Sequence, residues 1–367
     1  MGTDRDALEA RLRERIRREG PITFAAFMEA ALYDPEGFYA DLPVGADRDF
    51  VTSPHVSPAF GSLLARQLAQ CWELLGRPRP FRVVEAGAGD GTMARQVLAE
   101  AATAPPLAEA MSYAAVERSP AARRALVEAG VPVRGSLEEA GSAHVVLANE
   151  LLDNLPFHRL RGRDEETIEV LVDAGAEGFV EVEGPATQRA LEALEGAVDP
   201  GEERPVSPAA LELVDRVAET LAPGYAFLFD YGFAEGEAPG EVHAYLGHRV
   251  SGDVLSEPGS RDITAPVDLG AIGARARRAQ LQVWGPVTQR EALLGLGMRL
   301  WLQGVRRGTE EAEARGDHDG ARRLFEARSR ASILIDEAKL GGLRLLVLGS
   351  EGLPAPAAAL GDRPAGC

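Results

Sequence analysis

Hydrophobic positions follow two different periods along the chain, and these predict strands that alternate with helices. Short apolar or β-branched runs at residues 81–85, 113–117, 144–148 and 225–230 predict buried parallel strands. Between the strands, apolar residues three or four positions apart predict amphipathic helices, of which residues 60–75 are the clearest example. The alternation predicts an α/β fold.

Changes in this pattern divide the chain into regions. A helical start is followed by an α/β core, and short alternating runs rich in Glu and Gly predict a β-hairpin and loop insert within that core. The predicted regions are an N-terminal helical region that contributes to a pocket at 1–80, a core at 81–285 with its insert near 161–205, a helical cap region at 286–342, a last core strand at 343–351 and a disordered tail at 352–367.

A glycine cluster follows the first core strand. Gly87, Gly89 and Gly91 form a G-x-G-x-G turn, and Glu85 stands two positions before the first glycine. A dinucleotide fingerprint needs its third glycine at position 92, which is Thr92 here, placed to cap the next helix. Glycines let the backbone lie against a nucleoside. Alone, such a turn is as consistent with a plain strand-to-helix connection as with a cofactor site.

The ends of the next two strands carry further candidate groups. Glu117 follows Gly91 by 26 residues, close to the spacing at which an acid binds ribose hydroxyls in nucleotide-binding units. The alternative is that Glu117 caps the helix after Ser119. Ser136 and Leu137 follow the third strand, where an adenine would be held.

The fourth strand runs into polar residues, and ligands in doubly wound sheets lie outside such strand ends. Asn149, Glu150 and Asp153 are therefore candidate site residues, although acids are also favoured at helix starts. His158 is a candidate general base, and a structural histidine is an equal alternative.

Composition narrows the choice of partner and compartment. The formal net charge of −18 argues against nucleic acid, because phosphate binding needs concentrated Lys and Arg. Two cysteines and six scattered histidines leave no disulfide framework and no metal signature. Without an apolar leader or an apolar run of 18 residues, we expect no membrane insertion and a cytoplasmic protein. A homo-oligomer stays open.

Several motifs together resemble the MidA-like family of class I S-adenosylmethionine (SAM) methyltransferases, which includes a mitochondrial complex I assembly factor that dimethylates an arginine. The resemblance runs from about residue 20 to residue 349. Its motifs are Leu32–Pro35 with Gly37–Tyr39, Asp49–Pro54, Phe60–Gly61, Val84–Thr92, Val116–Glu117, Asn149–Glu150 with Asp153 and Leu155–Pro156, Asp230–Gly232, Gly247–Arg249 and Asp262–Thr264.

This resemblance implies a Rossmann-like sheet of seven strands with an added helical substrate or cap region. It implies that SAM is held by the glycine loop, Glu117 and the loop after the fourth strand. It also places the aromatic turn at 33–39 and the loop carrying Thr52 and Ser53 in the pocket wall. Three residues depart from the family pattern: His55, Pro205 and Pro266.

For function, the resemblance implies methyl transfer from SAM to a protein, at an arginine side chain. Glu150 and Asp153 would hold the guanidinium, and Asn149 would orient cofactor or acceptor. Two alternatives stay open: a small-molecule O- or N-methyltransferase, and an assembly factor that binds SAM without useful turnover.

Overall fold

A seven-stranded sheet forms the centre of the computed structural model, which describes residues 2–41, 51–164, 166–246 and 249–361. Its order is β16-β17-β10-β5-β2-β3-β4, in which β17 is antiparallel to both neighbours and the strands from β10 to β4 are parallel. The strands are β2 (Phe81–Ala86), β3 (Met111–Val116), β4 (Val133–Arg134), β5 (Ala143–Asn149), β10 (Leu221–Asp230), β16 (Gln282–Thr288) and β17 (Arg344–Gly349).

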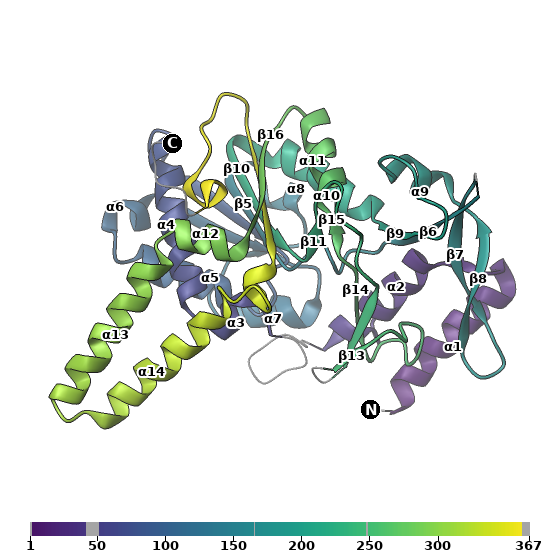
Figure 1. Ribbon diagram of the computed structural model, residues 1–367, viewed down its shortest axis with the longest axis horizontal. Helices are drawn as coiled ribbons and strands as arrows, with labels where there is room; N and C mark the ends of the chain where they lie inside the picture. The colour runs from purple at the N-terminus through teal and green to yellow at the C-terminus, as the bar shows by residue number, and fades with distance from the viewer. Residues whose placement is uncertain (1, 42–50, 165, 247–248, 362–367) are drawn as a thin grey trace.

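Helices cover both faces of this sheet, which explains why its strands are apolar without interruption (Figure 1). Side chains alternate between the faces. Val145, Phe227 and Val347 pack against one helical layer, and Val146 and Leu228 pack against the other. The first layer contains α4 (Ala59–Leu74), α5 (Thr92–Ala101), α6 (Pro105–Ala110), α7 (Pro120–Glu128) and α12 (Gln289–Gly295), and the second contains α8 (Leu137–Ala140), α10 (Pro208–Thr220) and α11 (Leu269–Arg278).

The predicted hairpin insert is a larger structure, a second sheet of five strands. Its strands β1 and β7 pair although about 150 residues separate them, with Ile22 opposite Val172. An apolar core that includes Phe24 and Phe27 lies between this sheet and the first helices. The elements are α1 (Gly2–Glu19), β1 (Ile22–Thr23), α2 (Phe24–Tyr33), β6 (His158–Arg163), β7 (Glu166–Ala174), β8 (Phe179–Pro185), α9 (Gln188–Ala193) and β9 (Glu203–Val206).

Short elements surround the carboxyl ends of the central strands. Thr23 caps α2, and its hydroxyl accepts the N–H of Ala26. The small sheets β11-β15 and β13-β12-β14 follow β10 in the chain. The short elements are η1 (Phe38–Ala40), α3 (Ser53–Val56), β11 (Gly232–Phe233), β12 (His243–Leu246), β13 (Arg249–Ser251), β14 (Asp262–Thr264), β15 (Val267–Asp268) and η2 (Leu340–Gly342).

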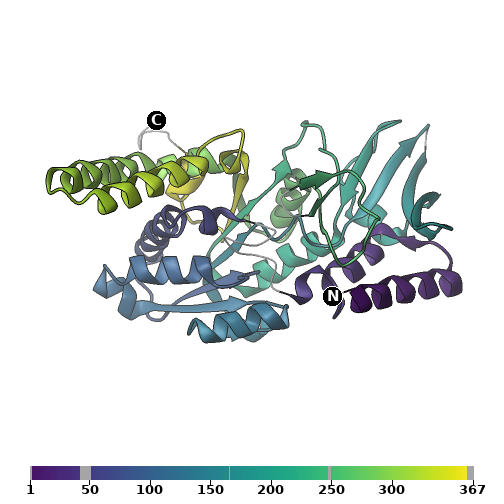
Figure 2. The ribbon, with the colours of Figure 1, turned by 90° about the horizontal axis from the view of Figure 1, so that it is seen from below.

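The C-terminal third differs from its prediction in three ways. Strand β16 crosses the expected boundary at residue 285. Its pairing with β17 is irregular between Trp284 and Val287, and Gly285 and Pro286 are not typical of a strand, so the sequence did not predict one there. The hairpin of α13 (Met298–Ala314) and α14 (His318–Ile333) projects away from the body of the molecule (Figures 1 and 2). Residues 352–361 are ordered, since α15 (Ala357–Leu360) buries two alanines in the core. Residues 362–367 of the predicted tail lie outside the described residues.

We predict that Phe227→Ala lowers the free energy of unfolding by about 3–5 kcal/mol, the usual cost of such a cavity. Phe227 is fully buried at the centre of β10, between β5 and β17. Denaturant titration would measure the change. Val127→Ala, at a residue that is 63% exposed, is the control and should change stability little. Equal effects of the two substitutions would contradict this account of the core.

Candidate active site

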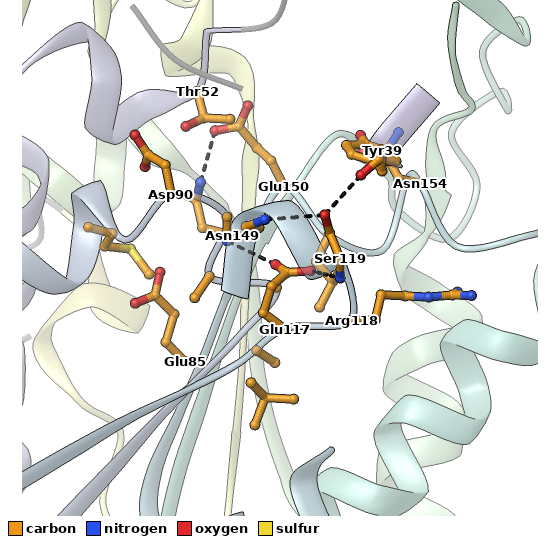
Figure 3. Close-up of a pocket in the computed structure, with 18 of the residues that line it drawn as sticks. Tyr39, Thr52, Glu85, Asp90, Glu117, Arg118, Ser119, Asn149, Glu150 and Asn154 are labelled. Carbon is orange, nitrogen blue, oxygen red and sulfur yellow. Dashed lines mark hydrogen bonds between the residues drawn. The ribbon is translucent and has the colours of Figure 1, made fainter. Parts of the chain in front are cut away.

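A cavity of about 340 Å³ opens at the carboxyl ends of β2, β3 and β5 (Figure 3). This size is within the range of cofactor sites. The N-terminal region supplies part of its wall, so Tyr33, Tyr39 and Thr52 face residues that follow the central strands. Of the predicted cofactor residues, those that line the cavity are Thr52, Glu85, Gly87, Gly89, Glu117, Ser136, Leu137, Asn149 and Glu150.

The glycine loop has the backbone that its sequence predicts. All three glycines have positive φ, at 69° for Gly87, 54° for Gly89 and 76° for Gly91. A Cβ on Gly89 would meet no atom within 4 Å. A Cβ on Gly91 would come 2.8 Å from Leu126, so Gly91 serves the turn and helix packing and does not line the cavity. Helix α5 takes Gly91 as its N-cap, one residue before the predicted Thr92.

Glu117 is fixed by main-chain donors on both sides. The N–H of Gly89 donates to its Oε2 at 3.0 Å, and the N–H of Ser119 donates to Oε1 at 2.8 Å (Figure 3). Burial raises the pKa of Glu117. The Ser119 hydroxyl caps α7 by accepting the N–H of Ala122, so the alternative role of Glu117 as that cap is not needed. Its carboxylate ties the glycine loop to the end of β3.

Glu150 joins the fourth strand to the N-terminal region. Its backbone has φ 52°, an uncommon value for a residue with a side chain. Its Oε1 accepts the N–H of Ser53 at 2.9 Å and the Nδ2–H of Asn149 at 3.0 Å. Burial raises the pKa of Glu150 to about 7, with a further contribution from Asp153. Ser53 itself is buried behind the wall and reaches the cavity only through this bond.

Two predicted catalytic residues do not line the cavity. Asp153 is buried beside it and accepts the Thr264 hydroxyl at 2.8 Å. His158 lies on β6 in the second sheet, where its Nδ1 is 2.6 Å from Glu169 Oε1. We therefore correct the prediction of a general base at His158, because the buried Glu169 contact fixes the ring away from the cavity. Asp153 lies behind the wall, where its charge raises the pKa of Glu150.

Two further carboxylates differ in their ionisation. Burial would raise the pKa of Asp90, but its contact with His55 and its hydrogen bonds from Thr92 outweigh it and hold the pKa at about 2. His55 Nε2 is 3.2 Å from Asp90 Oδ1, so the departure at position 55 provides a partner for an acid. Burial raises the pKa of Glu85 to about 8, although the Tyr113 hydroxyl donates to it at 2.6 Å.

The cavity wall also contains the aromatic turn that the resemblance placed there, together with residues that had no signal in the sequence. Tyr39 donates its hydroxyl to Asp262 at 3.2 Å, and Arg118 lies over the ring of Tyr33 at 3.8 Å. Leu213 and Arg216 reach the cavity from α10. Nothing local marks these two residues, because only the packing of α10 against the sheet brings them there.

A cofactor of the SAM class fits this arrangement. Gly89 leaves open space where a Cβ would stand, and Glu117 offers carboxylate oxygens at the adjacent strand end.

Among the described residues, no group of His, Cys, Asp and Glu could hold a metal ion. In the same part of the chain, no helix combines the length and apolarity needed to cross a membrane.

The strand order and the glycine loop after β2 are those of a class I SAM-dependent methyltransferase. A family model described as "Putative S-adenosyl-L-methionine-dependent methyltransferase" matches residues 63–287, more than half of the chain. The chain belongs to this family, which is the MidA-like family that its motifs indicated. It is therefore a SAM-dependent methyltransferase, and SAM is its cofactor.

Named relatives agree with this assignment. The mitochondrial protein arginine methyltransferase NDUFAF7 homolog of Drosophila melanogaster is 33% identical over 323 residues, which cover 77% of this chain and 73% of the relative. NDUFAF7 of Xenopus tropicalis is 28% identical over 338 residues, which cover 82% and 78%. The crystal structure of a COG1565 superfamily member from Burkholderia thailandensis, bound to S-adenosyl-homocysteine, is 31% identical with a TM-score of 0.84, and the match covers 98% of this chain and 96% of that chain.

These comparisons also correct one expectation. The NDUFAF7 relatives are mitochondrial by name. The prediction of a cytoplasmic protein is contradicted by this finding. The prediction rested on hydrophobic patterning alone, which does not identify a compartment.

We predict that the protein loses stability as pH rises. Burial raises the pKa values of Glu85, Glu150 and Asp262 to about 8, 7 and 8, whereas in the unfolded chain they titrate near pH 4. The folded state therefore binds more protons between about pH 4 and about pH 8, and the free energy of unfolding falls across that window. Thermal denaturation from about pH 5 to about pH 9 would measure a falling Tm.

Glu85→Gln is the matched variant for this prediction. The amide oxygen keeps an acceptor for the Tyr113 hydroxyl but cannot ionise, so the fall in Tm should be shallower than in the unsubstituted protein. A Tm that stays constant or rises with pH in the unsubstituted protein would contradict the prediction.

Proposed function

We propose that the methyl acceptor is an arginine side chain of a protein. Support comes from the relatives, which are named protein arginine methyltransferases, and from the carboxyl group that Glu150 places in the cavity wall. The observation that carries the proposal is Glu150. It lines the cavity, and both of its hydrogen bonds from described residues go to Oε1, which leaves Oε2 for a bound group.

In this proposal Glu150 binds one edge of the guanidinium. Charge-assisted contacts between guanidinium and carboxylate are among the strongest hydrogen bonds. Asp153 and Asp230 lie close to Glu150 and add negative potential when ionised. Asn149 holds the Glu150 carboxylate in place through its amide. The site thus favours a cationic acceptor over a neutral one.

Methyl transfer is an in-line displacement, so the protein contributes mainly position and electrostatics. The cofactor supplies the methyl group from its sulfonium. A guanidinium nitrogen forms the new N–C bond while the S–C bond breaks. The product guanidinium keeps its charge, and the proton released from nitrogen passes to the Glu150 carboxylate. A carboxylate whose pKa is about 7 is matched to receive a proton near neutral pH.

A small-molecule acceptor is less well supported. A pocket closed by the helices at 286–342 would have favoured it, but the described residues that line the cavity come from the N-terminal region and the core. The hairpin of α13 and α14 projects from the body of the molecule (Figures 1 and 2), and none of its described residues lines the cavity. We therefore treat the hairpin of α13 and α14, and not the whole predicted cap region, as a separate projection. The division into an N-terminal region, a core, a cap and a tail remains our proposal.

The first prediction concerns cofactor binding. Glu117→Ala should weaken binding of S-adenosyl-homocysteine by about 10-fold to 100-fold, because it removes a charged hydrogen-bond partner and frees the N–H of Gly89. Isothermal titration calorimetry would measure the dissociation constant. Asp215→Asn is the control, since Asp215 pairs with Arg275 on the surface. This variant should bind S-adenosyl-homocysteine with unchanged affinity. Unchanged affinity in Glu117→Ala would remove Glu117 from the cofactor site.

The second prediction concerns turnover. Glu150→Gln should lower kcat by about 10²-fold or more, because the amide cannot accept the released proton, and it should lower cofactor affinity much less. In the unsubstituted protein kcat/KM should fall as pH drops through about 7, since Glu150 must be ionised. The assay would use labelled SAM, an arginine-containing peptide library and mass spectrometry of methylarginine.

A library with lysine in place of arginine is the control for the acceptor. Methyl transfer to lysine, or to small molecules alone, would reject the arginine proposal while leaving the cofactor assignment standing. Full turnover in Glu150→Gln would remove Glu150 from the acceptor site.

A further inference from the structure

Strand β14 brings Asp262 to the edge of the cavity from outside the central sheet. Asp262 is 1% exposed. The Tyr39 hydroxyl donates to its Oδ1 at 3.2 Å, and the Asn154 amide donates to the same oxygen at 2.9 Å. The second oxygen, Oδ2, is buried and has no partner among the described residues. Two residues further along the same face, Thr264 donates to Asp153.

Both donors to Asp262 belong to the cavity wall. The Tyr33 hydroxyl donates to the Asn154 carbonyl at 2.9 Å, and its ring is stacked on Tyr39 with 5.5 Å between centroids. At the other end, the Ser119 hydroxyl donates to the Tyr39 carbonyl at 2.8 Å, beside Glu117 (Figure 3). The wall between Asp262 and Glu117 is therefore one hydrogen-bonded unit.

We propose that Asp262 is a positioning residue for the cofactor, which in its protonated form holds Tyr39 and Asn154 in the cavity wall. The pattern of contacts is that of a neutral carboxyl. One oxygen accepts two donors as a carbonyl does, and the other carries the proton. A buried oxygen without a donor is far less costly when neutral than when charged. This inference rests on the proposed placement of the cofactor in this cavity.

The surroundings of Asp262 agree with a neutral carboxyl. Burial, with Asp153 second, raises its pKa to about 8. Among the described residues, the titratable groups that face it are Asp153 from the loop after β5, Tyr33 of α2, Tyr39 of η1 and Tyr245 of β12. None of these four is a cation. Ionisation of Asp262 would place an unpaired charge beside Asp153 and loosen the wall.

The test is calorimetric titration with S-adenosyl-homocysteine between about pH 6 and about pH 9.5, on the full chain and two variants. Asp262→Asn keeps an acceptor oxygen and cannot ionise, so it should bind normally near pH 7 and lose less affinity than the unsubstituted protein above about pH 8. Asp262→Ala removes the acceptor and should bind about tenfold more weakly than the unsubstituted protein near pH 7.

Glu85 also titrates near pH 8 in the same cavity, so the difference between the unsubstituted protein and Asp262→Asn is the informative quantity. Asp268→Asn is the matched control, because Asp268 caps α11 and does not line this cavity; its pH profile should be unchanged. If Asp262→Ala does not fold, Tyr39→Phe replaces it and should weaken binding by removing the donor to Asp262.

Three outcomes would overturn the inference. If Asp262→Asn bound as weakly as Asp262→Ala at every pH, the charged form would be the active one. Identical pH profiles for Asp262→Asn and the unsubstituted protein would show that Asp262 does not ionise in this range. Normal affinity in Asp262→Ala would show that the wall does not need it. Failure of the arginine proposal alone would leave all these binding results unchanged.

Discussion

The active-site edge depends on buried carboxylates whose partners are main-chain N–H groups. Glu117 at the end of β3 accepts the N–H of Gly89 in the loop after β2. Glu150 at the end of β5 accepts the N–H of Ser53 from the N-terminal region, and Asp230 at the end of β10 accepts two N–H groups from the loop after β5. Each bond therefore joins one strand end to a neighbouring loop. Removing a carboxylate would leave buried donors unpaired, which is costly.

This arrangement keeps negative charge low until a ligand arrives. Burial raises the pKa values of Glu85, Glu150, Asp230 and Asp262, so several of these groups hold protons near neutral pH. A cation bound in the cavity lowers the pKa values of Glu85 and Glu150, the two of these groups that line it. Binding of a positively charged cofactor or acceptor is then coupled to proton release. The free energy that burial costs in the empty protein is partly recovered when the cation binds.

Most of the fold and part of the site could be predicted from local patterns in the sequence. The run before Gly87, the three positive-φ glycines and the strand-end acids could be predicted because each depends on neighbours in the sequence. The five-stranded sheet could not, since β1 pairs with β7 across about 150 residues and contributes only two residues. His158 was misplaced for the same reason. Its position after a strand end resembles that of Glu150, but β6 belongs to another sheet.

Long-range contacts also make the N-terminal region part of the same site as the core. Ser53 donates its N–H to Glu150, and its hydroxyl donates to Gln289 Oε1 at 3.0 Å. Gln289 in turn donates its amide to the Leu334 carbonyl, just after α14 ends. A continuous set of hydrogen bonds thus runs from the proposed acceptor carboxylate to the base of the projecting hairpin. The base of that hairpin, unlike its distant tip, is part of the support that holds the Ser53 loop against Glu150.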